Sequence, residues 1–134
     1  MGILDPWDDA LSIAQRLKTP GSMLVTVIGA QAWCEKCRTL KPFFDAQADR
    51  APEHMVWLWL DLEGHADFLG DYVPDSLPQL CIYQHGKLAK KVVLDDTPES
   101  LRDALQSLLA GALPLDDDDD PGIYQRLVLQ DWAR

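Results

Sequence analysis

Two cysteines that follow an apolar run constrain this chain more than any other feature. The run covers residues 23–28, Met-Leu-Val-Thr-Val-Ile, and lacks the alternation of a half-exposed strand, so it predicts a strand buried on both faces. Residues 34–51 predict a helix that opens with Cys34. A helix start offers free N–H groups and a positive dipole end, which favour the thiolate form of a cysteine. Cys37 follows one turn later, so the spacing predicts disulfide exchange with Cys34 as nucleophile and Cys37 as resolving thiol.

A zinc site is the main alternative for two cysteines at this spacing. A structural zinc ion usually takes four ligands, commonly two such cysteine pairs or one pair with two histidines. The chain has one further cysteine, Cys81, and its histidines, His54, His65 and His85, form no close ligand pair. The pattern therefore favours redox exchange over metal binding, and we expect neither a metal nor another cofactor.

The remaining apolar segments predict an α/β fold whose sheet has both parallel and antiparallel strands. Residues 55–60 form a second continuous apolar strand, so that strand, helix and strand make a right-handed parallel unit. The cysteines then lie at the carboxyl end of the first strand, where open α/β sheets usually hold their sites. Residues 80–83 and 88–94 flank a turn that contains glycine and predict an antiparallel hairpin.

Three more helices are expected in the domain and around it. The first begins at Pro6 and ends before Pro20-Gly21, a short one is indicated over residues 63–72, and the last begins at Pro98, after a Thr97 cap, and ends at Gly111. The last helix has a clear apolar face, formed by Leu101, Ala104, Leu105, Leu108 and Leu109.

The order of these motifs resembles the thioredoxin-like family. Pro42 lies five residues after Cys37, where that family has a proline that bends its first long helix. Leu77-Pro78, followed by an apolar strand, is similar to the family's cis-proline loop. The resemblance covers about residues 20–111 and implies a thioredoxin-like fold: a central mixed β-sheet flanked by helices, here with an acidic C-terminal extension.

The resemblance also implies roles for residues around the dithiol. Cys34 and Cys37 would form the redox-active disulfide, and Trp33 would shield the nucleophile and contact partners. Leu77 and Pro78 would bind the substrate, because the residue before the cis-proline hydrogen-bonds the substrate chain as an added strand. Cys81 is expected to be a buried thiol of the core rather than a catalytic one.

Several positions depart from the family pattern. Glu35 and Lys36 stand between the cysteines, where most thioredoxins have a glycine and a proline. The family commonly buries a carboxylate beneath the second cysteine, and that position aligns to Ile28. The lysine that accompanies the carboxylate aligns to Trp57, and a glycine beside the site falls near Leu94. We therefore expect slow exchange or a narrow set of partners.

Charge and hydropathy argue against nucleic acid and membranes as partners. The chain has 22 acidic against 12 basic residues, a formal net charge of -10, which repels nucleic acid and anionic membranes. The N-terminus lacks the basic and apolar regions of a signal peptide. The longest wholly apolar run, residues 55–60, is too short to span a bilayer. We expect a soluble, cytoplasmic protein.

The sequence divides at a proline near residue 113. Residues 1–112 predict the thioredoxin-like domain, and residues 113–134 an acidic tail with five aspartates at 116–120, followed by a short amphipathic helix. That helix docks on its own domain, stays free, or contacts a partner protein or a second copy; self-packing and disorder are the more common outcomes.

Two functions follow, with a third less favoured. The leading one is a thiol–disulfide oxidoreductase that reduces protein disulfides and receives electrons from an external reductase. The alternative is a binding or assembly module with little turnover, which uses the cis-proline loop and the tail to hold a partner. A metal- or cluster-handling protein that uses Cys34 and Cys37 in a shared site has little support in the sequence.

Overall fold

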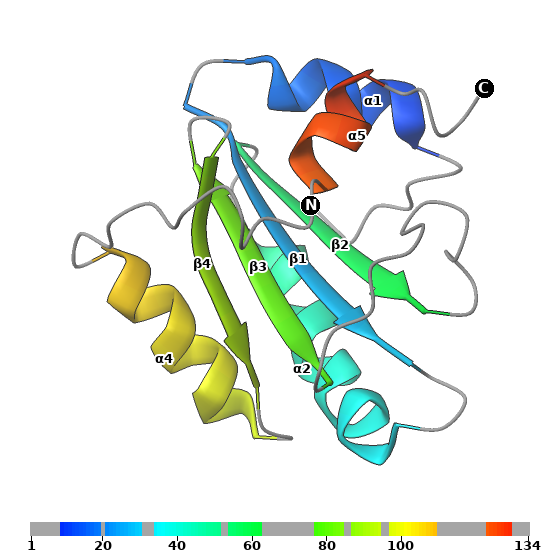
Figure 1. The fold of residues 1–134 in the computed structure, drawn as a ribbon. Coiled ribbons are helices and arrows are strands. Elements are labelled where there is room, and N and C mark those ends of the chain that lie inside the picture. The colour runs from blue at the N-terminus through cyan, green and yellow to red at the C-terminus, as the bar shows by residue number, and fades with distance from the viewer. Residues whose placement is uncertain are drawn as a thin grey trace.

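The computed structural model describes residues 9–19, 21–30, 34–51, 54–62, 77–84, 87–94, 97–109 and 123–129. Its elements are, in chain order, α1 (Ala10–Leu17), β1 (Met23–Gly29), α2 (Glu35–Arg50), β2 (Met55–Asp61), β3 (Gln79–Gln84), β4 (Lys87–Val93), α4 (Pro98–Leu109) and α5 (Ile123–Leu129) (Figure 1). Trp33, the predicted start of the first helix at Pro6, and the predicted helix over residues 63–72 lie outside the described residues.

The strands form one mixed sheet in the order β2-β1-β3-β4. β1 pairs with β2 in parallel, with Val27 beside Trp59, and with β3 in the antiparallel sense. β3 and β4 form an antiparallel hairpin whose register is irregular between Ile82 and Tyr83. The predicted parallel unit and the predicted hairpin are therefore confirmed, and β1 lies inside the sheet.

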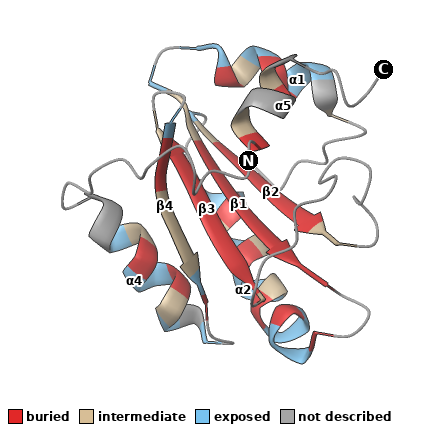
Figure 2. Cartoon of the chain, in the orientation of Figure 1, coloured by how far each residue is buried: buried red, intermediate tan, exposed pale blue. Residues whose placement is uncertain are grey.

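Helices cover both faces of this sheet (Figure 1). The core on one face joins β1, β2 and β3 to α2 and α4, and the core on the other face joins the same strands to α1 and α5. Figure 2 shows that β1, β2 and β3 are buried along most of their length. Their continuous apolar sequences reflect this position, because every side chain meets one of the two cores.

The helices α2 and α4 begin where the sequence predicts. α2 buries Cys37, Leu40, Phe44 and Ala48, which recur at helical spacing, and it contains Pro42. α4 begins at Pro98 directly after Thr97, whose Oγ1 accepts a hydrogen bond from the Ser100 N–H at 3.4 Å. This is the cap expected from the sequence.

The helix in the tail packs on the domain. Ile123 and Leu127 of α5 are buried in the core beneath α1. The Tyr124 hydroxyl donates a hydrogen bond to the Leu17 carbonyl oxygen at 3.0 Å, and its ring stacks on Tyr83 with centroids 6.0 Å apart. Of the alternatives for this segment, the structure shows self-packing. The domain boundary at 112/113 stays a prediction.

None of the helices in the described ranges is long and apolar enough to cross a membrane.

The packing of α5 predicts that Leu127→Ala destabilises the full chain. Leu127 is 1% exposed, so its truncation leaves a cavity and should lower the free energy of unfolding by about 2–4 kcal/mol. Leu11→Ala is the matched control, because Leu11 lies on α1 but is 63% exposed, and its cost should stay within about 0.5 kcal/mol. Thermal and denaturant unfolding of both variants checks this, and equal losses would contradict the packing of α5.

Candidate active site

Cys34 lies at the start of α2, just after β1 leaves the sheet. Its backbone is extended, with φ -100° and ψ 104°, and it is the N-cap residue of the helix. The Cys34 Sγ accepts a hydrogen bond from the Cys37 N–H at 3.2 Å, and the Cys34 carbonyl accepts one from the Arg38 N–H at 3.1 Å. The sulfur therefore occupies the place of a capping oxygen, where the N–H groups of the first turn favour a negatively charged acceptor.

Cys34 and Cys37 form a disulfide, with their Cα atoms 5.2 Å apart. The two sulfurs differ in access, because Cys34 is 9% exposed whereas Cys37 is fully buried. Exchange needs contact with the attacked sulfur, so an incoming thiolate meets Cys34 first. This asymmetry supports the predicted division between a nucleophile and a resolving thiol; the roles themselves stay predictions.

The loop before β3 approaches the same end of the sheet. The Leu77-Pro78 peptide bond is cis, as the resemblance implies. Gln79, the next residue, pairs with Ile28 near the end of β1, and the Pro78 carbonyl accepts a hydrogen bond from the Leu94 N–H at 2.9 Å. The loop is thus held between the last residues of β1 and β4. Substrate contact by Leu77 and Pro78 stays a prediction, as does the role of Trp33.

Cys81 belongs to the other core of the sheet, not to the one that contains Cys34 and Cys37. It lies within β3, is fully buried in the core beneath α1 and α5, and its thiol lies 3.9 Å from Gln79 Oε1. The expectation of a buried core thiol is confirmed. Within the described ranges, no cluster of three or more His, Cys, Asp and Glu residues is placed to hold a metal ion.

Gly29, not Ile28, faces Cys37 in the structure, so the residue that the family pattern predicts beneath the second cysteine does not lie there. Ile28 points into the core beneath α1 and α5, on the opposite face of the sheet from α2. Gly29 is the next residue in the strand, and successive residues of a strand face opposite sides of the sheet. A side chain at position 29 would therefore point toward α2. A Cβ at Gly29 would lie 3.1 Å from Cys37 Sγ and 2.8 Å from Trp59 Cζ2. The site therefore has an indole ring where a carboxylate side chain would have to fit.

Two tryptophans of β2 line this face of the sheet. Trp57 and Trp59 are 3% and 5% exposed, and both pack against Phe44 of α2, with ring centroids 5.1 and 5.5 Å apart. Lys41 Nζ lies 5.9 Å from the Trp59 ring centroid and pairs with Asp45 at 2.9 Å. Neither indole Nε1 has a hydrogen-bond partner among the described residues. Buried N–H donors without acceptors are uncommon, so they need an explanation.

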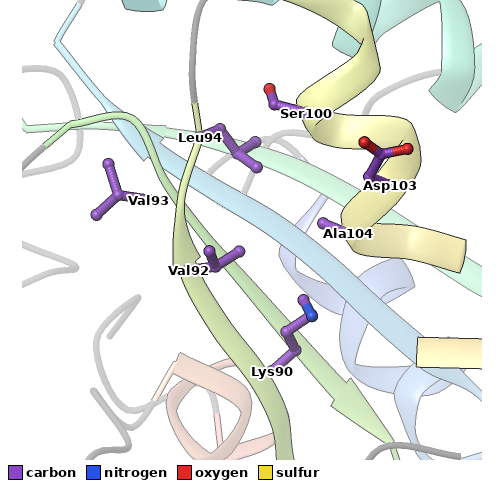
Figure 3. Close-up of a pocket in the computed structure, with 7 residues that line it drawn as sticks. All are labelled: Lys90, Val92, Val93, Leu94, Ser100, Asp103 and Ala104. Carbon is purple, nitrogen blue, oxygen red and sulfur yellow. The ribbon is translucent and has the colours of Figure 1, made fainter. Parts of the chain in front are cut away.

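A shallow cavity of about 270 Å³ lies between β4 and α4 (Figure 3). Its walls are Lys90, Val92 and Val93 from β4, Leu94 directly after the strand, and Ser100, Asp103 and Ala104 from α4. Val93 is 48% exposed and pairs with Gln79, so the cavity adjoins the end of the sheet that holds the cis-proline loop.

Sequence reasoning missed Gly29, Trp59 and this cavity. Gly29 and Trp59 lie in apolar runs that are buried on both faces, so the sequence does not indicate which face of the sheet each residue occupies. The cavity depends on how α4 packs on β4, which no local pattern predicts. The one available signal is parity: Gly29 and Trp59 are each two residues from other members of the α2-facing core, Val27 and Trp57.

Comparison with known proteins agrees with this architecture. The thioredoxin family model matches residues 14–107. Thioredoxin H1 of Arabidopsis thaliana is 29% identical over 107 residues, which are 80% of this chain and 85% of that protein. Thioredoxin of Gallus gallus is 30% identical over 91 residues, which are 63% of this chain and 86% of that protein.

Solved structures show the same fold. The germline-specific thioredoxin Deadhead of Drosophila melanogaster superposes with a TM-score of 0.62 at 15% identity, over 81% of this chain and 99% of that chain. A chain of the complex of ferredoxin:thioredoxin reductase with thioredoxin f2 gives a TM-score of 0.55 at 20% identity, over 81% of this chain and 94% of that chain. The predicted thioredoxin-like fold is therefore confirmed.

The burial of the sulfurs predicts the order of thiol labelling. After reduction, a brief pulse of alkylating reagent should modify Cys34 first, because it is less buried than Cys37 and lies at the helix start. In the oxidised chain, Cys81 should react only after denaturation. Mass spectrometry of the labelled peptides checks both statements, and preferential labelling of Cys37 would contradict the assigned order.

The contact beneath Cys37 predicts that Gly29→Ala strains the site. The added Cβ would lie 2.8 Å from Trp59 Cζ2, so the ring must shift, and we expect a loss of about 1–3 kcal/mol in the free energy of unfolding. Gly21→Ala provides the contrast, since its Cβ meets nothing within 4 Å and its cost, about 1 kcal/mol, comes from a φ of 82°. Denaturant unfolding of both oxidised variants measures the losses. A neutral Gly29→Ala would show that the ring does not occupy this place.

Proposed function

Because this chain belongs to the thioredoxin family, we propose that its thiol–disulfide oxidoreductase activity is reductive, and that Cys34 and Cys37 reduce disulfides of protein substrates. The observation that carries the proposal is the position of Cys34 at the start of α2, less buried than its partner and hydrogen-bonded to the first turn. A thiolate at that place is favoured, and its sulfur is the less buried of the two, as suits the thiol that attacks first.

The proposed reaction has two exchange steps. The Cys34 thiolate attacks one sulfur of the substrate disulfide; that S–S bond breaks, a mixed disulfide forms, and the leaving thiolate takes a proton from solvent. The Cys37 thiolate then attacks Cys34 Sγ, which forms the disulfide present in this structure and releases the second substrate thiol. Two electrons pass from the chain to the substrate, so an external reductase must restore the dithiol.

The substrate chain would lie along the cis-proline loop. Leu77 and Pro78 are held beside the end of β1, so a polypeptide whose disulfide is attacked by Cys34 would meet this loop. The cavity between β4 and α4 adjoins this loop and would take an apolar side chain of the substrate against Val92 and Val93. Trp33, next to Cys34 in sequence, would complete the contact surface.

The proposed partners are a protein disulfide and a reductase. A structure similar to this chain belongs to a complex of ferredoxin:thioredoxin reductase with thioredoxin f2, which supports reduction by an external enzyme. The net charge of -10 favours neither nucleic acid nor anionic membrane as a partner. A cytoplasmic site of action fits a reductive role, because the cytosol keeps thiols reduced.

A binding module with little turnover is the second candidate. The packing beneath Cys37 favours it, since Gly29 and Trp59 leave no room there for the carboxylate that assists the second cysteine in the family. The tail gives this second candidate less support than the sequence indicates, because α5 packs on its own domain and its buried residues are not available to a partner. A surface for a partner would then be the cis-proline loop and the adjoining cavity.

Trapping and turnover together test the proposal. Cys37→Ser should accumulate mixed disulfides with substrate proteins, because the resolving thiol is absent, and Cys34→Ser should form none at that site. Cys81→Ser, the matched control for loss of a buried thiol, should reduce a protein disulfide at the wild-type rate when supplied with a thioredoxin reductase. Trapping without turnover by the wild-type chain would favour the binding module, and the absence of both would refute the reductive role.

A further inference from the structure

We propose that the indole N–H of Trp59 donates a hydrogen bond to the Cys37 thiolate when the disulfide is reduced, so that Trp59 sets the pH range in which Cys37 resolves the mixed disulfide. This inference rests on the proposed function, since it concerns the second exchange step. It assigns to the buried tryptophan a positioning role at Cys37.

Gly29 brings the ring and the sulfur together. A single point, the Cβ position of Gly29, lies 2.8 Å from Trp59 Cζ2 and 3.1 Å from Cys37 Sγ. The Nε1 atom of an indole is two bonds from Cζ2, so the N–H belongs to the part of the ring next to the atom that approaches Gly29. The absence of a side chain at Gly29 is what permits this approach of the indole edge to the sulfur.

The N–H of Trp59 has no acceptor in the oxidised state. Its Nε1 is buried and lacks a hydrogen-bond partner among the described residues. A disulfide sulfur is a weak, uncharged acceptor, whereas a thiolate is charged and forms stronger hydrogen bonds. The N–H is therefore not hydrogen-bonded to Cys37 Sγ while the disulfide is intact, and we infer that it turns to this sulfur once reduction makes it a charged acceptor. A thiolate at Cys37 needs such a donor, because Cys37 is fully buried and a charge there is costly without a hydrogen bond.

Lys41 strengthens the donor. Its ammonium lies 5.9 Å from the centroid of the Trp59 ring and is held by Asp45 at 2.9 Å, one turn after Cys37 on α2. A cation over the ring face draws on its π electrons, which makes the N–H more acidic and a better donor. Within the described part of the chain no such cation lies over Trp57, although its N–H is also buried and has no partner there.

The effect on the reaction is confined to one step. In the mixed disulfide Cys37 loses its proton to solvent, and the indole N–H stabilises the thiolate that remains. The thiolate attacks Cys34 Sγ, the bond from Cys34 to the substrate sulfur breaks, and the electron pair leaves with the substrate thiolate. The N–H donates throughout and transfers no proton, so the attack of Cys34 on the substrate does not depend on it.

Two-phase kinetics test the assignment in the reduced full chain. An aromatic disulfide in excess should release one aromatic thiolate when Cys34 attacks and a second when Cys37 resolves, and stopped-flow absorbance follows both. Trp59→Phe keeps a ring but removes the N–H, so the second phase should slow about tenfold near pH 7 and approach the wild-type rate at high pH. The first phase should be unchanged. Trp57→Phe, the matched control on the same strand and face, should leave both phases as they are.

The outcomes separate this inference from the proposed function. Equal effects of Trp59→Phe and Trp57→Phe on the second phase, or an unchanged pH profile in Trp59→Phe, would overturn the role of Trp59 while the reduction of protein disulfides stands. Loss of turnover toward protein disulfides by the wild-type chain would instead overturn the proposed function.

A measurement on the unaltered chain decides the matter if Trp59→Phe fails to fold. In the reduced wild-type protein, the indole ¹⁵N–¹H signal of Trp59 should move downfield as Cys37 ionises, which the Cys37 ¹³Cβ shift reports, and the signal of Trp57 should not. A Trp59 signal that stays constant while Cys37 ionises would overturn the proposal.

Discussion

The burial of β1 on both faces is the constraint on which the rest of the structure depends. This strand pairs with β2 on one side and β3 on the other, and its side chains enter two cores, one beneath α2 and α4 and one beneath α1 and α5. Such a strand has no exposed face for chemistry. The reactive groups lie instead where β1 ends, and Cys34 follows within a few residues as the cap of the next helix.

Because of that arrangement, the nucleophilic cysteine and the first turn of α2 depend on each other. Cys34 Sγ accepts the N–H of Cys37, so the nucleophile is also part of the helix start. Cys37 is carried by the first turn into the core, where Gly29 and Trp59 surround it. The Cys34 thiol therefore lies at the helix start with a small exposed fraction, and the Cys37 thiol lies fully buried beside an aromatic ring. The difference between the two environments is what a two-step exchange requires.

Much of the fold was predictable from local patterns. Continuous apolar runs, the spacing of the cysteines, Pro78 before a strand and Pro98 after Thr97 each indicated an element that the structure contains. Two features were not predictable in this way. Ile28 and Gly29 are neighbours in a strand buried on both faces, so a shift of one residue exchanges the two cores. The docking of α5 depends on burial of Ile123 and Leu127, whereas a helix of that length is marginal alone.

The close approach of Gly29, Trp59 and Cys37 also limits how this site can change through mutation. A carboxylate introduced at Gly29 collides with the indole ring, and a smaller residue at Trp59 alone leaves a void beside Cys37. Each single step lowers stability, although the two together would make room for an acid. The positions are therefore epistatic, and a lineage with this glycine–tryptophan pair reaches the carboxylate form only through a less stable intermediate or a simultaneous double change.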